Sequence, residues 1–203
     1  MPDIHLEHPQ CIRKALRIEW FLIIYNVAEA AASIAFGLSA GSAALVGFGL
    51  DSVIEVSAAA VLIWRLSVHT SDEEEERGEK KALFFIGLSF FALAAYVGID
   101  SALKLFQHKV PETSVGGIVV AVLSLATMPF FAAAKKKIAR RIGSKALEAD
   151  AMETLICGWL SGILLAGLVL NTLLGWWWAD SAAGIGMAVF MLNEGREAVR
   201  ESR

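Results

Sequence analysis

Apolar residues divide the chain into six long hydrophobic segments separated by short polar ones. Each is close to the roughly 20 residues that an α-helix needs to cross the hydrocarbon core of a bilayer. The segments occupy residues 18–38, 43–66, 82–106, 115–134, 147–170 and 176–192. The pattern predicts an all-α membrane protein, a bundle of six transmembrane helices forming a single transmembrane domain over residues 1–203, without a separate cytosolic domain.

The polar connections predict how these helices follow one another. SAGS between the first two segments is typical of a tight turn, which makes the two helices antiparallel neighbours, whereas HTSDEEEERGEKK is too charged to enter lipid. KKKIARRIGSK follows the fourth segment, and only NTLLG separates the fifth from the sixth. Small residues along the second segment, among them Gly47 and Gly49, predict close helix packing.

The basic residues predict an orientation. If the N-terminus is cytosolic, all of the 18 Lys and Arg residues except Lys104 and Lys109 fall on the cytosolic side. Such a bias predicts that both termini are cytosolic. The tryptophans agree, because Trp20 and Trp64 fall at the inner interface and residues 176–178 at the outer one. Short loops and this charge bias favour a bacterial inner membrane.

Composition narrows the class of protein. A hydrophobic fraction of 56% with a mean hydropathy of +0.58 is unusual for a soluble domain. A net charge of -3 suggests no nucleic-acid partner, and the polar residues 1–17 do not form a signal peptide. Two cysteines exclude a disulfide framework. The four histidines lie outside the apolar segments, which rules out a histidine-lined metal centre within the membrane.

Two acidic residues interrupt the second segment, in the stretch GFGLDSVIEV at residues 47–56. Asp51 and Glu55 are four residues apart and share one helix face. Charge at this depth is costly and usually marks a functional site. Glu153 and Cys157 repeat the spacing in the fifth segment. Because the two helices run in opposite directions, contact between them would place Asp51 opposite Cys157 and Glu55 opposite Glu153.

Four such ligands at matched depth can form a tetrahedral site, the geometry that zinc prefers. A thiolate also favours cobalt, cadmium or ferrous iron over magnesium and calcium. Carboxylates and thiols must lose protons to bind a metal, so metal and protons compete for the site. The residues therefore indicate a metal/proton antiporter, a secondary transporter and not an enzyme.

The same stretches resemble a known family. LDSVIEV is similar to the second transmembrane helix of cation diffusion facilitators, and EADAMETLIC followed by GWWWADSAAG resembles their fifth helix and the start of their sixth. The resemblance covers nearly the whole chain. It implies a homodimer that exchanges cytosolic divalent cations for protons, with Asp51, Glu55, Glu153 and Cys157 as ligands.

The chain departs from the family pattern in two respects. Glu153 stands where the family usually has His or Asp, and Cys157 stands where it has Asp, so the metal preference does not transfer. Zinc is the first expectation, with iron, manganese, cobalt and cadmium as further candidates. The chain also resembles a compact form lacking the C-terminal cytosolic domain, which would place dimer contacts in the membrane or in short loops.

Other acidic residues have two interpretations each. Glu29, Asp150 and Asp180 are candidates for an ion or proton path. Alternatively, Glu29 hydrogen-bonds a neighbouring helix, Asp150 is a solvated acid in a first helical turn, and Asp180 interacts with a helix N-terminus. Asp100, four residues before Lys104, predicts a salt bridge.

The four site residues have structural alternatives as well. Asp51 and Glu55 can hydrogen-bond between helices, Glu153 can extend towards a cytosolic loop, and Cys157 alone would be an ordinary small apolar residue. Asp72 with the four glutamates after it forms either a solvated loop or a cation-concentrating entrance. The spacing of His5, His8 and Cys11 also allows metal binding at the N-terminus.

Two other functions compete with transport. One is a non-transporting membrane subunit that senses metal or supports a partner. The other is a membrane enzyme with Cys157 as its nucleophile, which is disfavoured because no histidine or lysine within the membrane is available to activate the thiol.

Overall fold

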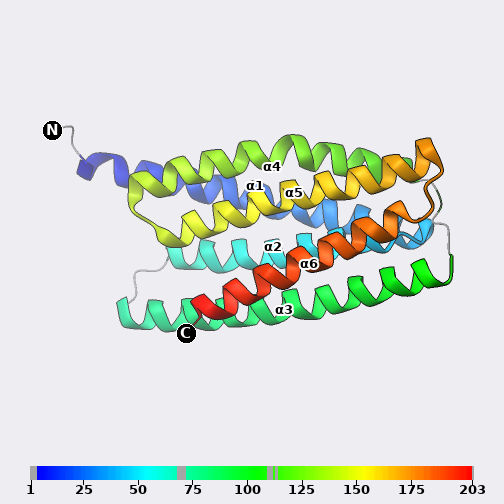
Figure 1. Ribbon diagram of the computed structural model, residues 1–203. Coiled ribbons are helices and arrows are strands. Elements are labelled where there is room, and N and C mark those ends of the chain that lie inside the picture. The colour runs from blue at the N-terminus through cyan, green and yellow to red at the C-terminus, as the bar shows by residue number, and fades with distance from the viewer. Residues whose placement is uncertain (1–3, 68–71, 109–111, 113, 203) are drawn as a thin grey trace.

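The six apolar segments correspond to six helices that run along one common direction (Figure 1). The computed structural model describes residues 4–67, 72–108, 112 and 114–202. Within the helices, it does not describe the side chains of residues 4–9, 65–67, 72–79, 81–83, 85, 86, 89, 145, 146, 149 and 201. The helices are α1 Ile4–Ala40, α2 Ala43–Ser67, α3 Asp72–Phe106, α4 Val115–Ile142, α5 Lys145–Leu174 and α6 Ala179–Glu201. The predicted all-α, six-helix architecture is confirmed.

The helices extend beyond the apolar segments because charged residues continue them. Lysine and arginine are good helix formers, so α4 continues through the basic stretch after residue 134 and ends only at Gly143, whose φ of 68° is left-handed. Ser144 then caps α5, its hydroxyl accepting the Leu147 amide at 3.3 Å. The connection between α4 and α5 is therefore a two-residue turn, much shorter than the polar sequence suggested.

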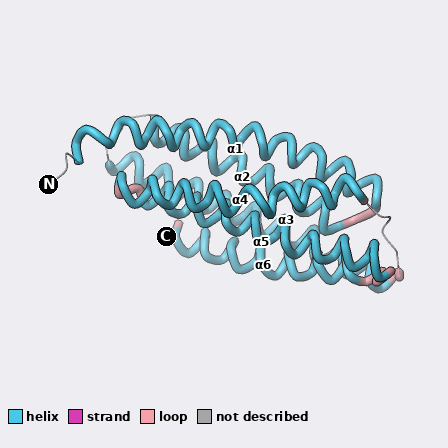
Figure 2. The backbone as a smooth tube through the Cα atoms, turned by 90° about the horizontal axis from the view of Figure 1, so that it is seen from above, coloured by secondary structure: helices cyan, strands magenta, loops and turns pink. Residues whose placement is uncertain are grey.

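The α1–α2 connection is the tight turn that the sequence predicted. Gly41 adopts a φ of +66°, and the Ser42 amide donates to the Gly37 carbonyl at 2.9 Å. The reversal makes α1 and α2 antiparallel neighbours. Extensive contacts also join α3 to α6 and α4 to α5. Figure 2 shows the same bundle from above.

Four helices of the described part are both long and apolar enough to cross a bilayer, over Gln10–Ala40, Ala43–Trp64, Val115–Ile142 and Asp150–Leu174. Part of the apolar run of α3 lies outside the described side chains. Large apolar side chains such as Ile24, Phe130 and Leu173 are exposed on the outer surface of the bundle, as lipid contact requires.

Small residues bring the helices close together. A Cβ on Gly47 would lie 2.5 Å from the Val97 side chain of α3, and one on Gly49 would lie 2.8 Å from Ile34 of α1. The close packing predicted for the second segment is thus present on two sides of α2. It holds one face of α2 towards the interior, where α2 also contacts α5.

Candidate metal-binding site

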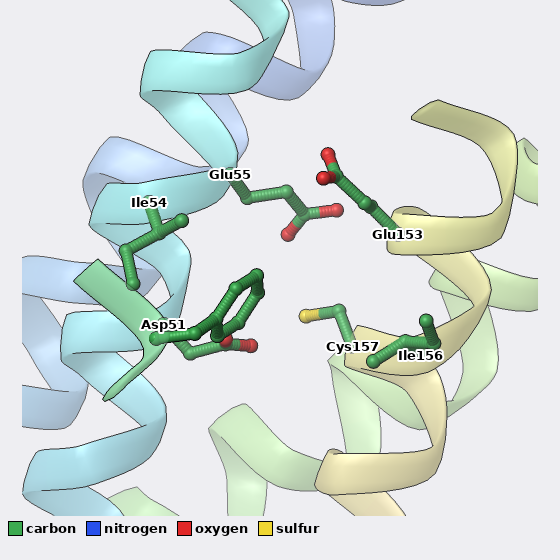
Figure 3. A pocket seen from close by; sticks show the side chains of 7 residues that line it. Asp51, Ile54, Glu55, Glu153, Ile156 and Cys157 are labelled. Carbon is green, nitrogen blue, oxygen red and sulfur yellow. The ribbon is translucent and has the colours of Figure 1, made fainter. Parts of the chain in front are cut away.

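The two predicted residue pairs line one small cavity in the interior of the bundle (Figure 3). Asp51 and Glu55 approach it from α2, and Glu153 and Cys157 approach it from α5. In Figure 3 the Asp51 carboxylate and the Cys157 thiol lie at one level and the Glu55 and Glu153 carboxylates at the next. The structure therefore brings together all four residues in the register expected from opposed helices.

The rest of the cavity wall is apolar. Ile54 and Ile156 complete it from the same two helices, and Phe90 contributes from α3. Phe90 could not be predicted from the sequence, because one phenylalanine in a run of apolar residues carries no chemical signal. The cavity volume is about 10 Å³, close to the minimum that holds one water molecule. Such a space suits a single ion and excludes an organic substrate.

Burial makes the site chemically demanding. Asp51, Glu55 and Cys157 are 5%, 7% and 1% exposed. Both Glu55 oxygens are buried without a hydrogen-bond partner among the described residues. A buried polar group without a partner is costly, so this carboxylate is stabilised by a proton or a cation.

The four side chains surround the cavity without closing on a common point. In the described part of the chain, no three His, Cys, Asp or Glu side chains are close enough together to hold a metal ion. Holding one ion would require the carboxylate side chains of the two helices to turn inward.

The three candidates for an ion or proton path are all buried, and each has a defined partner. Ser52 donates to Glu29 Oε2 at 2.9 Å, which links α2 to α1. The Ser42 hydroxyl donates to Asp180 Oδ1 at 2.5 Å, which links the α1–α2 turn to the first turn of α6. The structure separates all three residues from the cavity lining, which includes none of them.

Asp150 differs most from its sequence interpretation. It is 6% exposed and paired with Lys135, at 2.5 Å from Nζ to Oδ2, so the solvated first-turn acid is wrong. The reason is tertiary packing: α4 covers this face of α5 and supplies a lysine within the bundle.

Lys135 is the residue that sequence reasoning missed. It is 1% exposed, and its Nζ also lies 2.9 Å from Glu19 Oε2 of α1 and donates to Thr154 Oγ1 at 3.1 Å. We call Glu19, Lys135, Asp150 and Thr154 the Lys135 cluster. The expectation that no lysine lies within the apolar bundle is therefore wrong, although the Lys135 ammonium is held by these partners.

The sequence did contain a signal for this lysine. The buried face of α4 follows helical spacing through Ser124, Met128, Ala132, Lys135 and Ala139. Lys135 falls on that stripe, whereas its lysine neighbours at 136 and 137 do not. Continuing the stripe past the last apolar residue would have placed Lys135 inside the bundle.

The remaining predictions concern residues away from the cavity between α2 and α5. The Asp100–Lys104 salt bridge is confirmed, with Nζ and Oδ2 2.6 Å apart. Asp72 and the glutamates after it form the first turns of α3, so the prediction of a loop at these residues is wrong. His5 and His8 lie in α1, and the side chains of all these residues are outside the described ones. Cys11 is buried beside a different cavity, between α1 and α4.

The bundle, with its long apolar helices and its acidic interior cavity, defines a multi-pass integral membrane protein. Residues 20–203 match the family model described as the cation efflux transmembrane domain. The chain therefore belongs to the cation efflux family, as its resemblance to cation diffusion facilitators indicated.

Three relatives illustrate the similarity. An uncharacterized transporter of Synechocystis is 26% identical over 80% of the chain, and transmembrane protein 163 of Xenopus laevis is 26% identical over 90%. The cation-efflux pump FieF of Klebsiella pneumoniae is 30% identical over 79% of the chain. The chain spans 54%, 65% and 56% of the lengths of these relatives, respectively.

Proposed function

We propose that this protein is a secondary transporter that exports a divalent transition-metal cation in exchange for protons. Asp51, Glu55, Glu153 and Cys157 are the metal ligands, and zinc is the first candidate substrate. The observation that carries the proposal is the ion-sized cavity between α2 and α5, which all four ligand-type side chains line. The relative FieF is named a cation-efflux pump, which supports the same direction of transport.

Proton coupling follows from the chemistry of the four ligands. A cluster of three carboxylates and a thiol within the bundle is too costly to leave fully ionised and empty. Protons neutralise it when the metal is absent, and the metal displaces them when it binds. Exchange of one for the other across the membrane is antiport.

Zinc is favoured by the mixed ligand set. The Cys157 thiolate disfavours the hard cations magnesium and calcium, while the carboxylates retain affinity for iron, manganese and cobalt. Cadmium, which is softer than zinc, is also expected to bind. The proposal therefore predicts a range of transition-metal substrates with zinc or cadmium bound most tightly.

The wider setting is proposed on the same basis. We infer that the described bundle is a single transmembrane domain, that both termini are cytosolic and that two copies form a homodimer in a bacterial inner membrane. The basic stretch at the α4–α5 turn supports this orientation.

Metal-driven proton flux in proteoliposomes loaded with a pH-sensitive dye tests the proposal. Zinc, cadmium, iron, manganese and cobalt are compared for the wild type and for Asp51→Asn. Asp100→Asn is the matched control, because it removes the same charge at a carboxylate outside the cavity. Flux that is lost in Asp51→Asn and kept in Asp100→Asn is the expected result.

The alternative function, a metal-sensing or scaffold subunit, gives a different outcome. Such a protein would release protons on binding metal in detergent, yet it would carry no flux in liposomes. Absence of flux from folded, correctly inserted protein would exclude transport, and isothermal titration would then show whether the site binds metal at all.

A further inference from the structure

A second and larger cavity lies between α1 and α4. Its lining residues belong to the end of the bundle where α1 begins and α4 ends, and Figure 1 shows this end of the two helices. Its volume is about 380 Å³, within the range of small-molecule binding sites. Residues at i, i+3, i+4 and i+7 of α4 face residues at i and i+3 of α1 across it. The lining residues are Cys11, Lys14, Ala134, Lys137, Ile138 and Arg141.

The polar part of this lining is entirely basic apart from one buried thiol. Lys14, Lys137 and Arg141 are exposed, and among the described residues no carboxylate lines the cavity. None of the three forms an ion pair with a residue in the described part of the chain. Lys135, only two residues from Lys137, is by contrast neutralised inside the bundle. Three cations around one cavity, without an ion pair among the described residues, favour an anionic ligand.

Further along α1 and α4, towards the middle of the membrane, the two helices carry aromatic side chains that pack together. Phe21 of α1 and Phe131 of α4 pack with ring centroids 5.2 Å apart, and Trp20 beside them is 57% exposed. The distance along α1 from Lys14 to Phe21 is about 10 Å, at roughly 1.5 Å per residue. The cations therefore lie at headgroup depth when the aromatic side chains lie at the level of the acyl chains.

We propose that this cavity binds an anionic phospholipid of the adjacent leaflet. The phosphate contacts Lys14, Lys137 and Arg141, and the first part of an acyl chain lies along Phe21 and Phe131. A lipid fits better than a soluble anion because it satisfies both the cations and the aromatic side chains in a continuous molecule. Basic cavities between transmembrane helices at the membrane surface recognise headgroups in this way.

Native mass spectrometry of the full chain, titrated with phosphatidylglycerol or phosphatidylcholine in detergent, tests the proposal. The cavity variant removes three cations, and the control variant removes three cations from the same two helices at similar depth that do not line the cavity. The cavity variant combines Lys14→Gln, Lys137→Gln and Arg141→Gln. The control variant combines Arg17→Gln, Lys136→Gln and Arg140→Gln.

The expected result is that phosphatidylglycerol binds the wild type and the control variant more tightly than phosphatidylcholine. The cavity variant should bind phosphatidylglycerol roughly a hundredfold more weakly, the combined loss of three headgroup-level cations. Equal loss in both variants would show diffuse attraction to the basic surface and would overturn the proposal. Equal affinity of the wild type for both lipids would do the same.

Two further measurements complete the test. Inorganic phosphate is added as a competitor, and displacement of the lipid at matched concentration would show that the cavity recognises a free anion and not a lipid. Ala134→Leu fills the cavity without changing its charge, so it should also weaken phosphatidylglycerol binding even if the triple variant fails to fold. Unchanged binding in Ala134→Leu would place the lipid elsewhere.

Discussion

Replacing Lys135 with methionine removes the only cation of a buried cluster while nearly preserving side-chain length. In the structure this ammonium lies 2.5 Å from Asp150 Oδ2 and 2.9 Å from Glu19 Oε2. The three side chains are 1%, 7% and 0% exposed, respectively. Methionine would leave two carboxylates facing each other in a space that water does not reach.

The magnitude follows from the cost of an uncompensated buried charge. Removing one partner of a buried ion pair typically costs about 3–5 kcal/mol. Here one substitution leaves two acidic partners, so we expect a loss of stability in the upper part of that range. Uptake of protons by the carboxylates limits the loss, because a protonated acid avoids the desolvation cost of its charge. Acidification should therefore partly restore the variant.

The assay is the free energy of unfolding, measured by titrating the purified protein with SDS in mixed micelles and following helical circular dichroism. Lys136→Met is the matched control, because this lysine is adjacent, only partly buried and not paired with any described residue. It should change stability by less than about 0.5 kcal/mol, as most surface substitutions do.

A neutralised cluster separates charge from packing. Lys135→Met combined with Glu19→Gln and Asp150→Asn removes every charge while keeping the side-chain volumes similar. Replacement of a complete buried ion pair is often close to neutral, so most of the lost stability should return. If Lys135→Met costs less than about 1 kcal/mol, or if the neutralised variant is no more stable than the single one, the reasoning is refuted.

Four other outcomes follow from the structure and from the proposed site. Gly195→Ala should lower the free energy of unfolding by about 1–3 kcal/mol, because the added Cβ would lie 3.0 Å from a backbone oxygen of α3. Gly186→Ala is the control, because the nearest atom to its added Cβ is 3.9 Å away, and equal effects of the two substitutions would contradict close α3–α6 packing. Ser42→Ala should lower the free energy of unfolding by about 1–3 kcal/mol in the same titration, because it leaves the buried Asp180 carboxylate without its hydrogen-bond donor. If adding Asp180→Ala restores the lost stability, the Ser42–Asp180 hydrogen bond is confirmed as the cause. As the pH is lowered, metal affinity measured by isothermal titration should fall about tenfold per pH unit for each proton that metal binding releases, and a pH-independent affinity would exclude proton competition. Cys157→Ser should weaken cadmium binding more than manganese binding in the same titration.

The sequence alone determined the features that depend on local pattern. Apolar length predicted six helices, and the i, i+4 spacing of Asp51 with Glu55 and of Glu153 with Cys157 predicted two helix faces carrying ligand-type side chains. Since depth in a membrane follows from distance along a helix, opposed helices also predicted which residues share a level. These inferences need no knowledge of which helices are neighbours beyond the contact of α2 with α5.

Tertiary structure decided which charged side chains enter the bundle. Lys135 opens a run of identical lysines, and successive residues of a helix point about 100° apart, so only the packing of α1 and α5 against α4 selects which one is buried. Asp150 changed from a solvated acid to an ion-paired one for the same reason. Local sequence specifies the charge of each side chain, but its environment depends on residues from other helices, which only the folded bundle brings together.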